Sequence, residues 1–198
     1  MGPGKEVFIV RICVFSGSSE GRLPEYRRLA EALGRELANQ GIGLVYGGAS
    51  RGLMGAIADA ALEGGGEVIG VIPRSLFKSE VAHAGLTALY EVGSMHQRKA
   101  RMANLADAFI ALPGGFGTFD ELFEIITWAQ LGIHQKPIGL LDVADYFVPL
   151  LSLVRHAVHE GFVPQGNLDL IHYEQDPAAL LEVLASTPSP SRILLSQP

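Results

Sequence analysis

A stretch from residue 108 to residue 121 combines a glycine turn with acidic side chains. Its apolar run, Ala108–Leu112, predicts a buried strand, and three glycines follow within four positions, ahead of an expected acidic, amphipathic helix. The N–H groups and the dipole of a helix N-terminus favour an anion, and glycines let a phosphate approach the main chain because they carry no Cβ. These residues predict a site for a phosphate-bearing ligand at the carboxyl edge of a sheet.

The rest of the chain alternates strand patterns with helix patterns. Strands are expected at 7–15, 42–46, 67–72, 87–92, 108–112, 137–141 and 169–173, and helices at 24–40, 53–63, 94–105, 118–131, 146–160 and 177–185. Residues 74–86 show no regular pattern. The alternation predicts an α/β fold with a doubly wound, Rossmann-like parallel sheet flanked by helices.

Three loops rich in glycine or serine should meet at one edge of this sheet, because right-handed crossovers place all strand-to-helix loops there. They are Ser16–Ser19, Gly47–Gly52 and Pro113–Thr118. We therefore expect Ser16 and Gly17 to contact the ligand, although the same residues could form a plain turn.

Composition sets the outer limits. With 198 residues, 48% of them hydrophobic, the chain can form one core, so we expect a single domain at 7–186 between a flexible N-terminus, 1–6, and a mobile Ser/Pro-rich tail, 187–198. A net charge of −6 without a long basic run argues against a nucleic-acid partner. The lack of an apolar run of about 18 residues argues against a membrane span. A lone cysteine, Cys13, fits the reducing cytoplasm.

The glycine loops do not match the common nucleotide fingerprints. The chain has no G-x-x-x-x-G-K-[ST] sequence, and the first strand is followed by Ser-Gly-Ser-Ser rather than by G-x-G-x-x-G. The second strand ends Val45-Tyr-Gly-Gly48, without the acid that binds a dinucleotide's ribose. A mononucleotide or sugar phosphate is therefore favoured. No metal site is expected: His156 and His159 share a helix face, but no carboxylate joins them at ligand spacing.

Four segments resemble the LOG family. Pro113–Glu121 resembles its P-G-G-x-G-T-x-x-E motif, and Met95–Lys99 resembles the companion motif. Tyr46–Gly55 and Thr127–His134 are also similar to family segments. The resemblance covers roughly Ile9 to Tyr173, with the segments in order and at sensible spacing.

This resemblance implies a cytokinin riboside 5′-monophosphate phosphoribohydrolase. Such an enzyme hydrolyses the N-glycosidic bond of an N6-substituted AMP and releases the free base and ribose 5-phosphate. The family implies a Rossmann-like homodimer or higher homo-oligomer, with a nucleoside 5′-monophosphate as substrate, and we expect no cofactor. Its catalytic pair falls on Arg98 and Glu121. Its nucleotide-binding positions fall on Glu80, Arg98, Lys99, Gly114, Gly115, Phe116, Gly117, Thr118, Phe119, Asp120, Glu121 and Thr127.

The chemistry suits Glu121, which should lie within one helical turn of the bound phosphate. Hydrolysis of an N-glycosidic bond develops positive charge at the anomeric carbon, which a carboxylate near the ribose can stabilise. The competing interpretation is structural. Thr118 and Glu121 have the S/T-x-x-E spacing of a capping box, in which the glutamate bonds back to the helix cap. The glycine run and the resemblance favour catalysis.

Arg98 and Lys99 lie on a predicted helix and could simply form a solvated basic face. A phosphate site in an acidic protein still needs convergent cations, and arginine binds phosphate or carboxylate with two parallel hydrogen bonds. We expect Arg98 to contact the substrate and to position Glu121, with Lys99 adding charge. Glu80 falls in the irregular segment, where an exposed loop carboxylate is the simpler interpretation.

Two other functions compete with hydrolysis. A noncatalytic nucleotide-binding or carrier protein could use the same fold, and it would bind a nucleotide without releasing base. Lysine decarboxylation, an old label for the family, typically uses pyridoxal phosphate, and no lysine here has a clear Schiff-base context.

Overall fold

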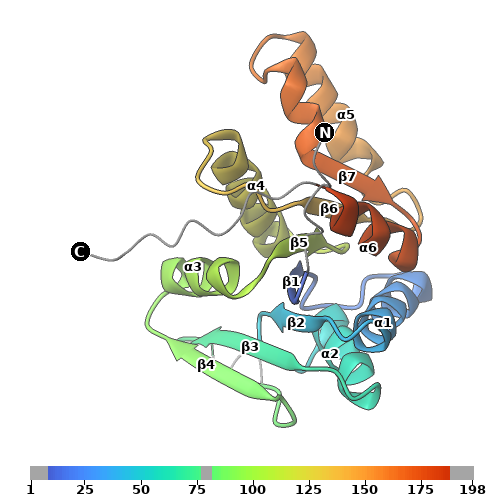
Figure 1. Cartoon of the computed structure of the whole chain (residues 1–198), viewed down its shortest axis with the longest axis vertical. Coiled ribbons are helices and arrows are strands. Elements are labelled where there is room, and N and C mark those ends of the chain that lie inside the picture. The colour runs from blue at the N-terminus through green and yellow to red at the C-terminus, as the bar shows by residue number, and fades with distance from the viewer. Residues whose placement is uncertain (1–8, 77–81, 188–198) are drawn as a thin grey trace, which may run out of the picture.

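The computed structural model describes residues 9–76 and 82–187. Over these ranges seven strands pair into one sheet in the order β4-β3-β2-β1-β5-β6-β7, and each pairing is parallel (Figure 1). The strands are β1 (Arg11–Phe15), β2 (Gly43–Tyr46), β3 (Val68–Pro73), β4 (Ala88–Val92), β5 (Ala108–Ala111), β6 (Ile138–Leu141) and β7 (Ile171–Glu174). The predicted Rossmann-like α/β fold is confirmed.

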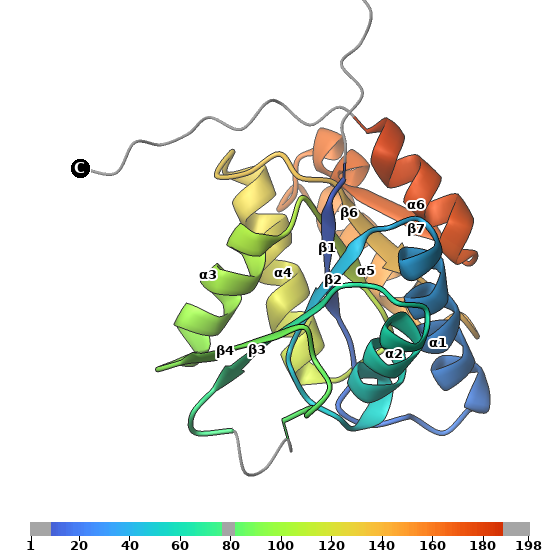
Figure 2. The same cartoon turned by 60° about the horizontal axis from the view of Figure 1, so that its bottom comes forward.

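Helices cover both faces of the sheet. They are α1 (Pro24–Asn39), α2 (Gly52–Glu63), α3 (Met95–Leu105), α4 (Phe116–Gln130), α5 (Val148–His159), the short 3-10 helix η1 (Gln165–Leu170) and α6 (Pro177–Ser186). One apolar core joins the sheet to α1, α2 and α6, and a second joins it to α3, α4 and α5 (Figure 2). A sheet enclosed in this way explains why its central strands are continuous apolar runs.

The chain order creates a switch point at the centre of the sheet. β1 and β5 lie side by side, with Val14 opposite Ile110. From β1 the chain builds outward through β2, β3 and β4, and it then returns to build β5, β6 and β7 on the other side. The loops that follow β1 and β5 therefore depart from the sheet in opposite directions, and a crevice forms between them. Open α/β sheets bind ligands in this crevice.

Four boundaries differ from those predicted by two residues or more, and one of them is the start of α5, at Val148 rather than at residue 146. β1 begins at Arg11, because this is its first residue in register with β2, opposite Gly43; residues 9 and 10 come before it. Residues 7 and 8 lie outside the described part. The edge strand predicted from Asp169 begins at Ile171, since a 3-10 turn following Pro164 takes the residues before it. α4 begins two residues early, at Phe116. Of the predicted termini, 1–6 and 188–198 lie outside the described residues.

Helices α1 and α2 pack closely at Gly34. A Cβ added there would lie 2.5 Å from the carbonyl oxygen of Ile57 and 3.0 Å from the Cβ of Ala60. Both neighbours belong to α2, whose backbone cannot rotate out of the way as a side chain could. This contact holds α2 against the sheet, and with it the loop that precedes α2 at the crevice.

We predict that Gly34→Ala lowers the free energy of unfolding by about 1–3 kcal/mol, because the two helices must separate. Helix propensity alone gives the opposite sign, since alanine is favoured over glycine by about 1 kcal/mol in a helix. Denaturant unfolding measures the change. Gly117→Ala is the matched control, because a Cβ at that helical position meets nothing within 4 Å. An unchanged stability for Gly34→Ala would contradict the prediction.

Candidate active site

Helix α4 opens on main-chain amides at the crevice. Its N-cap is Gly115, which supplies no side-chain cap, and its first helical hydrogen bond runs from the N–H of Phe119 to the carbonyl of Gly115 at 3.0 Å. The N–H groups of residues 115–118 therefore have no acceptor within the helix. The capping-box interpretation is wrong, because Thr118 is the third residue of the helix rather than its cap.

The three predicted loops do converge, and Gly17 joins them. Its N–H donates to the carbonyl of Pro113 at 3.1 Å, and its own carbonyl accepts from the N–H groups of Leu53 and Met54 at 3.0 and 3.3 Å. Both backbone groups of Gly17 thus bind protein atoms, so its contribution is to tie the loops after β1 and β5 to the start of α2. Gly52 completes the junction: its φ of 63° and the contact that a Cβ would make with the Ser18 backbone both demand glycine.

Ser16, the first residue after β1, lies beneath these loops. Its side chain is only 7% exposed, and its Oγ finds no hydrogen-bond partner among the residues that the structure describes. Buried hydroxyls are nearly always satisfied by protein, by water or by a ligand. The predicted contact between Ser16 and a ligand therefore gains support from its surroundings.

Arg98 reaches the same edge from α3. It is 4% exposed, and its guanidinium donates from Nε to the carbonyl of Val71 at 3.0 Å and from Nη2 to that of Gly47 at 2.9 Å. A Cβ on residue 47 would overlap the guanidinium, so a glycine is required there for the Arg98 side chain to fit. The alternative of a solvated basic face is wrong for Arg98, whose buried guanidinium binds carbonyls within β3 and just after β2.

Glu121 lies in the second turn of α4, one turn later than predicted because the helix begins early. It is 9% exposed. Burial raises the pKa of the Cys13 thiol most; the charge of Glu121 raises this pKa further, and the charges of Lys136 and Arg98 lower it. The two residues of the predicted catalytic pair are thus both buried, Arg98 on α3 and Glu121 on α4.

Lys99 and Asp120, both predicted to bind the nucleotide, contact each other. The Lys99 Nζ lies 3.0 Å from Asp120 Oδ2 and 3.1 Å from Glu124 Oε1, and the lysine side chain is largely buried between them. This bridge ties α3 to α4. Lys99 therefore holds the helix that carries Glu121, and its charge is shared with two carboxylates.

Thr127 does not join the site within one chain. It is exposed on α4, its hydroxyl donates to the carbonyl of Phe123 at 2.7 Å, and its position six residues after Glu121 turns it to another side of the helix. Phe116 is 93% exposed at the start of α4, whereas Phe119 is partly buried. Glu80 lies outside the described residues.

Sequence reasoning missed Tyr146, which lies in the turn after β6. Its hydroxyl donates to the carbonyl of Gly114, inside the glycine loop. The only sequence signal there was the apolar periodicity that placed Tyr146 at the start of a helix. No pattern along the chain could connect it with a loop 32 residues earlier.

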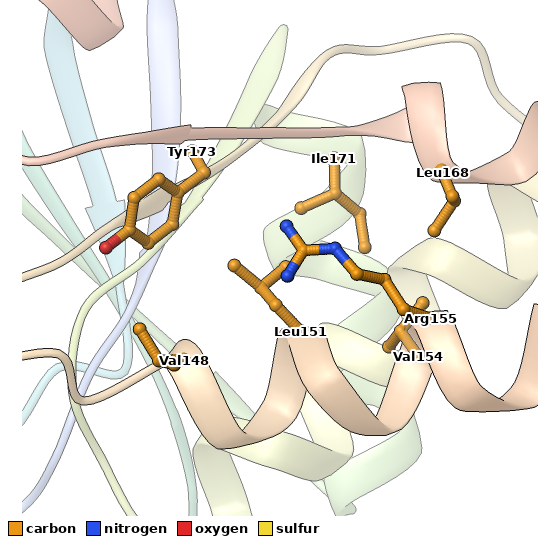
Figure 3. Close-up of a pocket in the computed structure, with 7 residues that line it drawn as sticks. All are labelled: Val148, Leu151, Val154, Arg155, Leu168, Ile171 and Tyr173. Atoms are coloured by element: carbon orange, nitrogen blue, oxygen red, sulfur yellow. The ribbon is translucent and has the colours of Figure 1, made fainter.

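A separate pocket of about 340 Å³ lies between α5, η1 and β7 and contains no predicted site residue (Figure 3). It is lined by Val148, Leu151, Val154, Arg155, Leu168, Ile171 and Tyr173. Elsewhere in the described ranges, no cluster of three or more His, Cys, Asp or Glu side chains could hold a metal ion. No helix among the described residues is both long and apolar enough to cross a membrane.

The fold and site together define a Rossmann-like α/β protein with main-chain amides, a buried arginine and a buried glutamate at its switch point. The sequence model of a family described as "Possible lysine decarboxylase" matches residues 54–184. The chain is 55% identical over 161 residues to the cytokinin riboside 5′-monophosphate phosphoribohydrolase LOG of Oryza sativa, spanning 81% of this chain and 66% of that protein. It is 55% identical over 153 residues to LOG7 of Arabidopsis thaliana, which carries the same enzyme name, spanning 77% and 70%. The chain belongs to this family, the LOG family.

Solved structures of other proteins share the fold. The molybdenum cofactor binding protein of Rippkaea orientalis superposes with a TM-score of 0.68 at 23% identity, over 89% of this chain and 95% of that one. The molybdenum cofactor carrier protein of Chlamydomonas reinhardtii gives a TM-score of 0.66 at 21% identity, over 89% and 96%. At such identities the likeness establishes the fold alone.

We predict that Gly47→Ala displaces the Arg98 guanidinium and lowers the free energy of unfolding by about 1–3 kcal/mol, because the new Cβ overlaps this buried charged group and breaks its hydrogen bonds to the Gly47 and Val71 carbonyls. A crystal structure of the variant together with denaturant unfolding measures both effects. Gly166→Ala, where a Cβ meets nothing within 4 Å, is the control. An Arg98 that still reaches both carbonyls in the variant would contradict the prediction.

Proposed function

We propose that this chain hydrolyses the N-glycosidic bond of adenosine 5′-monophosphates, N6-substituted ones included, and releases the free base and ribose 5-phosphate. The observation that carries the proposal is the similarity to phosphoribohydrolases: more than half of the residues are identical over about four-fifths of the chain. The switch-point site supplies the parts that this reaction needs.

In this proposal the 5′-phosphate binds the N-terminus of α4. Gly114, Gly115 and Gly117 let it approach the backbone, and the N–H groups of residues 115–118 donate to its oxygens. Ser16 offers its buried hydroxyl from the other side of the crevice. Thr118 is buried directly under the loop, where a Cβ on Gly114 would overlap it, so it supports the anion site from below.

Glu121 is the proposed catalytic carboxylate. As the bond from C1′ to the base nitrogen breaks, the electron pair leaves with the base and positive charge develops on the ribose. The Glu121 carboxylate stabilises that charge and takes a proton from the water whose oxygen bonds to C1′. The departing nitrogen takes a proton from solvent and Glu121 later releases to solvent the proton that it took up, so the net products, with one water consumed, are the neutral base and ribose 5-phosphate. Arg98 provides electrostatic support and holds its end of the crevice rigid, since a guanidinium is a poor proton donor.

The two competing functions fit less well. The lysines of the described ranges are both occupied: Lys99 pairs with carboxylates, and Lys136 donates to the carbonyl of Ala103 at 2.7 Å. Neither has the surroundings of a Schiff-base lysine. A carrier needs no buried carboxylate beside an anionic ligand, because burying that charge has a large cost. The position of Glu121 therefore favours catalysis.

We also propose a homodimer, in the cytoplasm, formed through α4 and α5, with residues 7–186 as one domain. Large apolar side chains are exposed on and just after these helices: Phe116, Phe123, Leu131, Ile133, Val148, Leu153 and Phe162. Exposed apolar groups at this density are typical of subunit interfaces. Thr127 lies on the same exposed side of α4, where a partner subunit could bring it to a nucleotide.

We predict that Glu121→Gln lowers the turnover of AMP by about 10²–10⁴-fold, since the amide can neither take up a proton nor carry negative charge. Chromatographic detection of free adenine measures it. Glu124→Gln, one turn further along α4, is the matched control and should lose less than about tenfold, because the amide oxygen still accepts from Lys99. Wild-type turnover by Glu121→Gln would refute the assignment, and wild-type protein that binds AMP but releases no base would refute the function.

We predict that introducing Leu131→Glu and Ile133→Glu together raises the dimer dissociation constant at least about 100-fold, because two carboxylates would be buried in the interface. Light scattering with sedimentation measures the mass. Val10→Glu is the control, since this exposed apolar residue lies just before β1 and belongs to neither α4 nor α5. A doubly substituted chain with the wild-type mass, or a monomeric wild type, would show that the interface lies elsewhere or does not exist.

A further inference from the structure

The turn after β6 has a strained backbone. Ala144 and Asp145 both adopt left-handed conformations, with φ of 56° and 55°, and neither is a glycine. Side chains make this region unfavourable, and two such residues in succession are rare. Strain of this kind persists only where the surrounding structure enforces it, and it gathers at functional sites. The strained turn is therefore a candidate for a functional role, and none of the roles assigned above explains it.

Buried groups hold the turn at both ends. The Asp142 carboxylate, fully buried at the end of β6, accepts from the N–H of Phe147 at 3.1 Å and from the hydroxyl of Tyr173 at 2.7 Å. The Phe147 ring is itself fully buried. Tyr173 lies at one end of the pocket in Figure 3, so its hydroxyl bond links β7 to the turn. These contacts fix residues 142 and 147, which lie on either side of the two strained residues.

The residue that this turn presents to the crevice is Tyr146. Its ring packs edge-on against Phe147 and Tyr26, with centroids 5.1 and 5.9 Å apart. Its hydroxyl donates to the carbonyl oxygen of Gly114. The strained turn after β6 thus contacts the glycine loop that follows β5, the neighbouring strand.

This hydrogen bond fixes the direction of an amide on the other side of the peptide plane. In a trans peptide the carbonyl of one residue and the N–H of the next point in opposite directions. Holding the Gly114 carbonyl toward Tyr146 therefore turns the Gly115 N–H away from it. The bond from Gly17 N–H to the Pro113 carbonyl does the same one peptide earlier and directs the Gly114 N–H.

We propose that Tyr146 is a positioning residue for the 5′-phosphate: it acts through the Gly114 carbonyl to direct the Gly115 N–H into the anion site. Glycine loops are flexible, and two consecutive peptides with defined orientations bind an anion better than two that rotate. The Tyr146 hydroxyl donates to the glycine loop itself, so we expect its effect to be confined to ligands that carry phosphate. This inference rests on the proposed function only for the identity of the anion.

The test compares a ligand that has phosphate with one that does not. Calorimetry measures the affinity of ribose 5-phosphate and of adenine for the full-length wild type and for Tyr146→Phe, which keeps the ring packing and removes the hydroxyl. We expect ribose 5-phosphate to bind about fivefold more weakly to the variant, as for the loss of one net hydrogen bond, and adenine to bind equally well. In the turnover of AMP, the same variant should raise KM and leave kcat within about twofold.

Tyr173→Phe is the matched control. It also removes a tyrosine hydroxyl bond from the same network, and thermal melting should show a loss of stability, but its ratio of the two affinities should stay at the wild-type value. Three outcomes would overturn the proposal: unchanged binding of ribose 5-phosphate by Tyr146→Phe, an equal loss for both ligands, or a wild type that does not bind ribose 5-phosphate. Release of base from AMP by the wild type decides the proposed function separately.

Discussion

One hydrogen bond between two loops organises the functional end of this protein. The Gly17 N–H donates to the Pro113 carbonyl and so joins the loop after β1 to the loop after β5, at the point in the sheet where the strand order reverses. The same glycine accepts the first amides of α2 with its carbonyl. The loops at the crevice are therefore joined by main-chain bonds into one frame, and a Cβ at Gly17 would lie 3.0 Å from the carbonyl oxygen of Ser19, closer than an ordinary contact.

This frame explains how charged groups can be buried beside it. A buried guanidinium or carboxylate has a large desolvation cost unless other polar groups compensate it. Arg98 offsets that cost by donating to the carbonyls of Val71, within β3, and of Gly47, just after β2. Lys99, the next residue, binds two carboxylates of α4 and fixes the helix that carries Glu121. Adjacent residues of α3 thus orient both halves of the proposed catalytic pair.

The sequence was sufficient for the sheet, because strands buried on both faces appear as apolar runs and each glycine turn marks a strand end. It was sufficient for the convergence of three loops, since right-handed crossovers leave no other arrangement. It misplaced the start of α4, because Thr118 has the chemistry of a cap while the real cap, Gly115, has none. The contacts that Lys99 and Tyr146 make could not be predicted, since their partners lie on other elements and depend on tertiary packing.

A crystal structure of Glu121→Gln with bound AMP tests the central claim most directly, because the variant should retain the substrate. The expected electron density places the phosphate oxygens within hydrogen-bond distance of the N–H groups of residues 115–118 and C1′ of the ribose beside the side chain at 121. A phosphate bound elsewhere, for example by Arg155 in the pocket between α5 and β7, or a ribose remote from position 121, would contradict the proposed site.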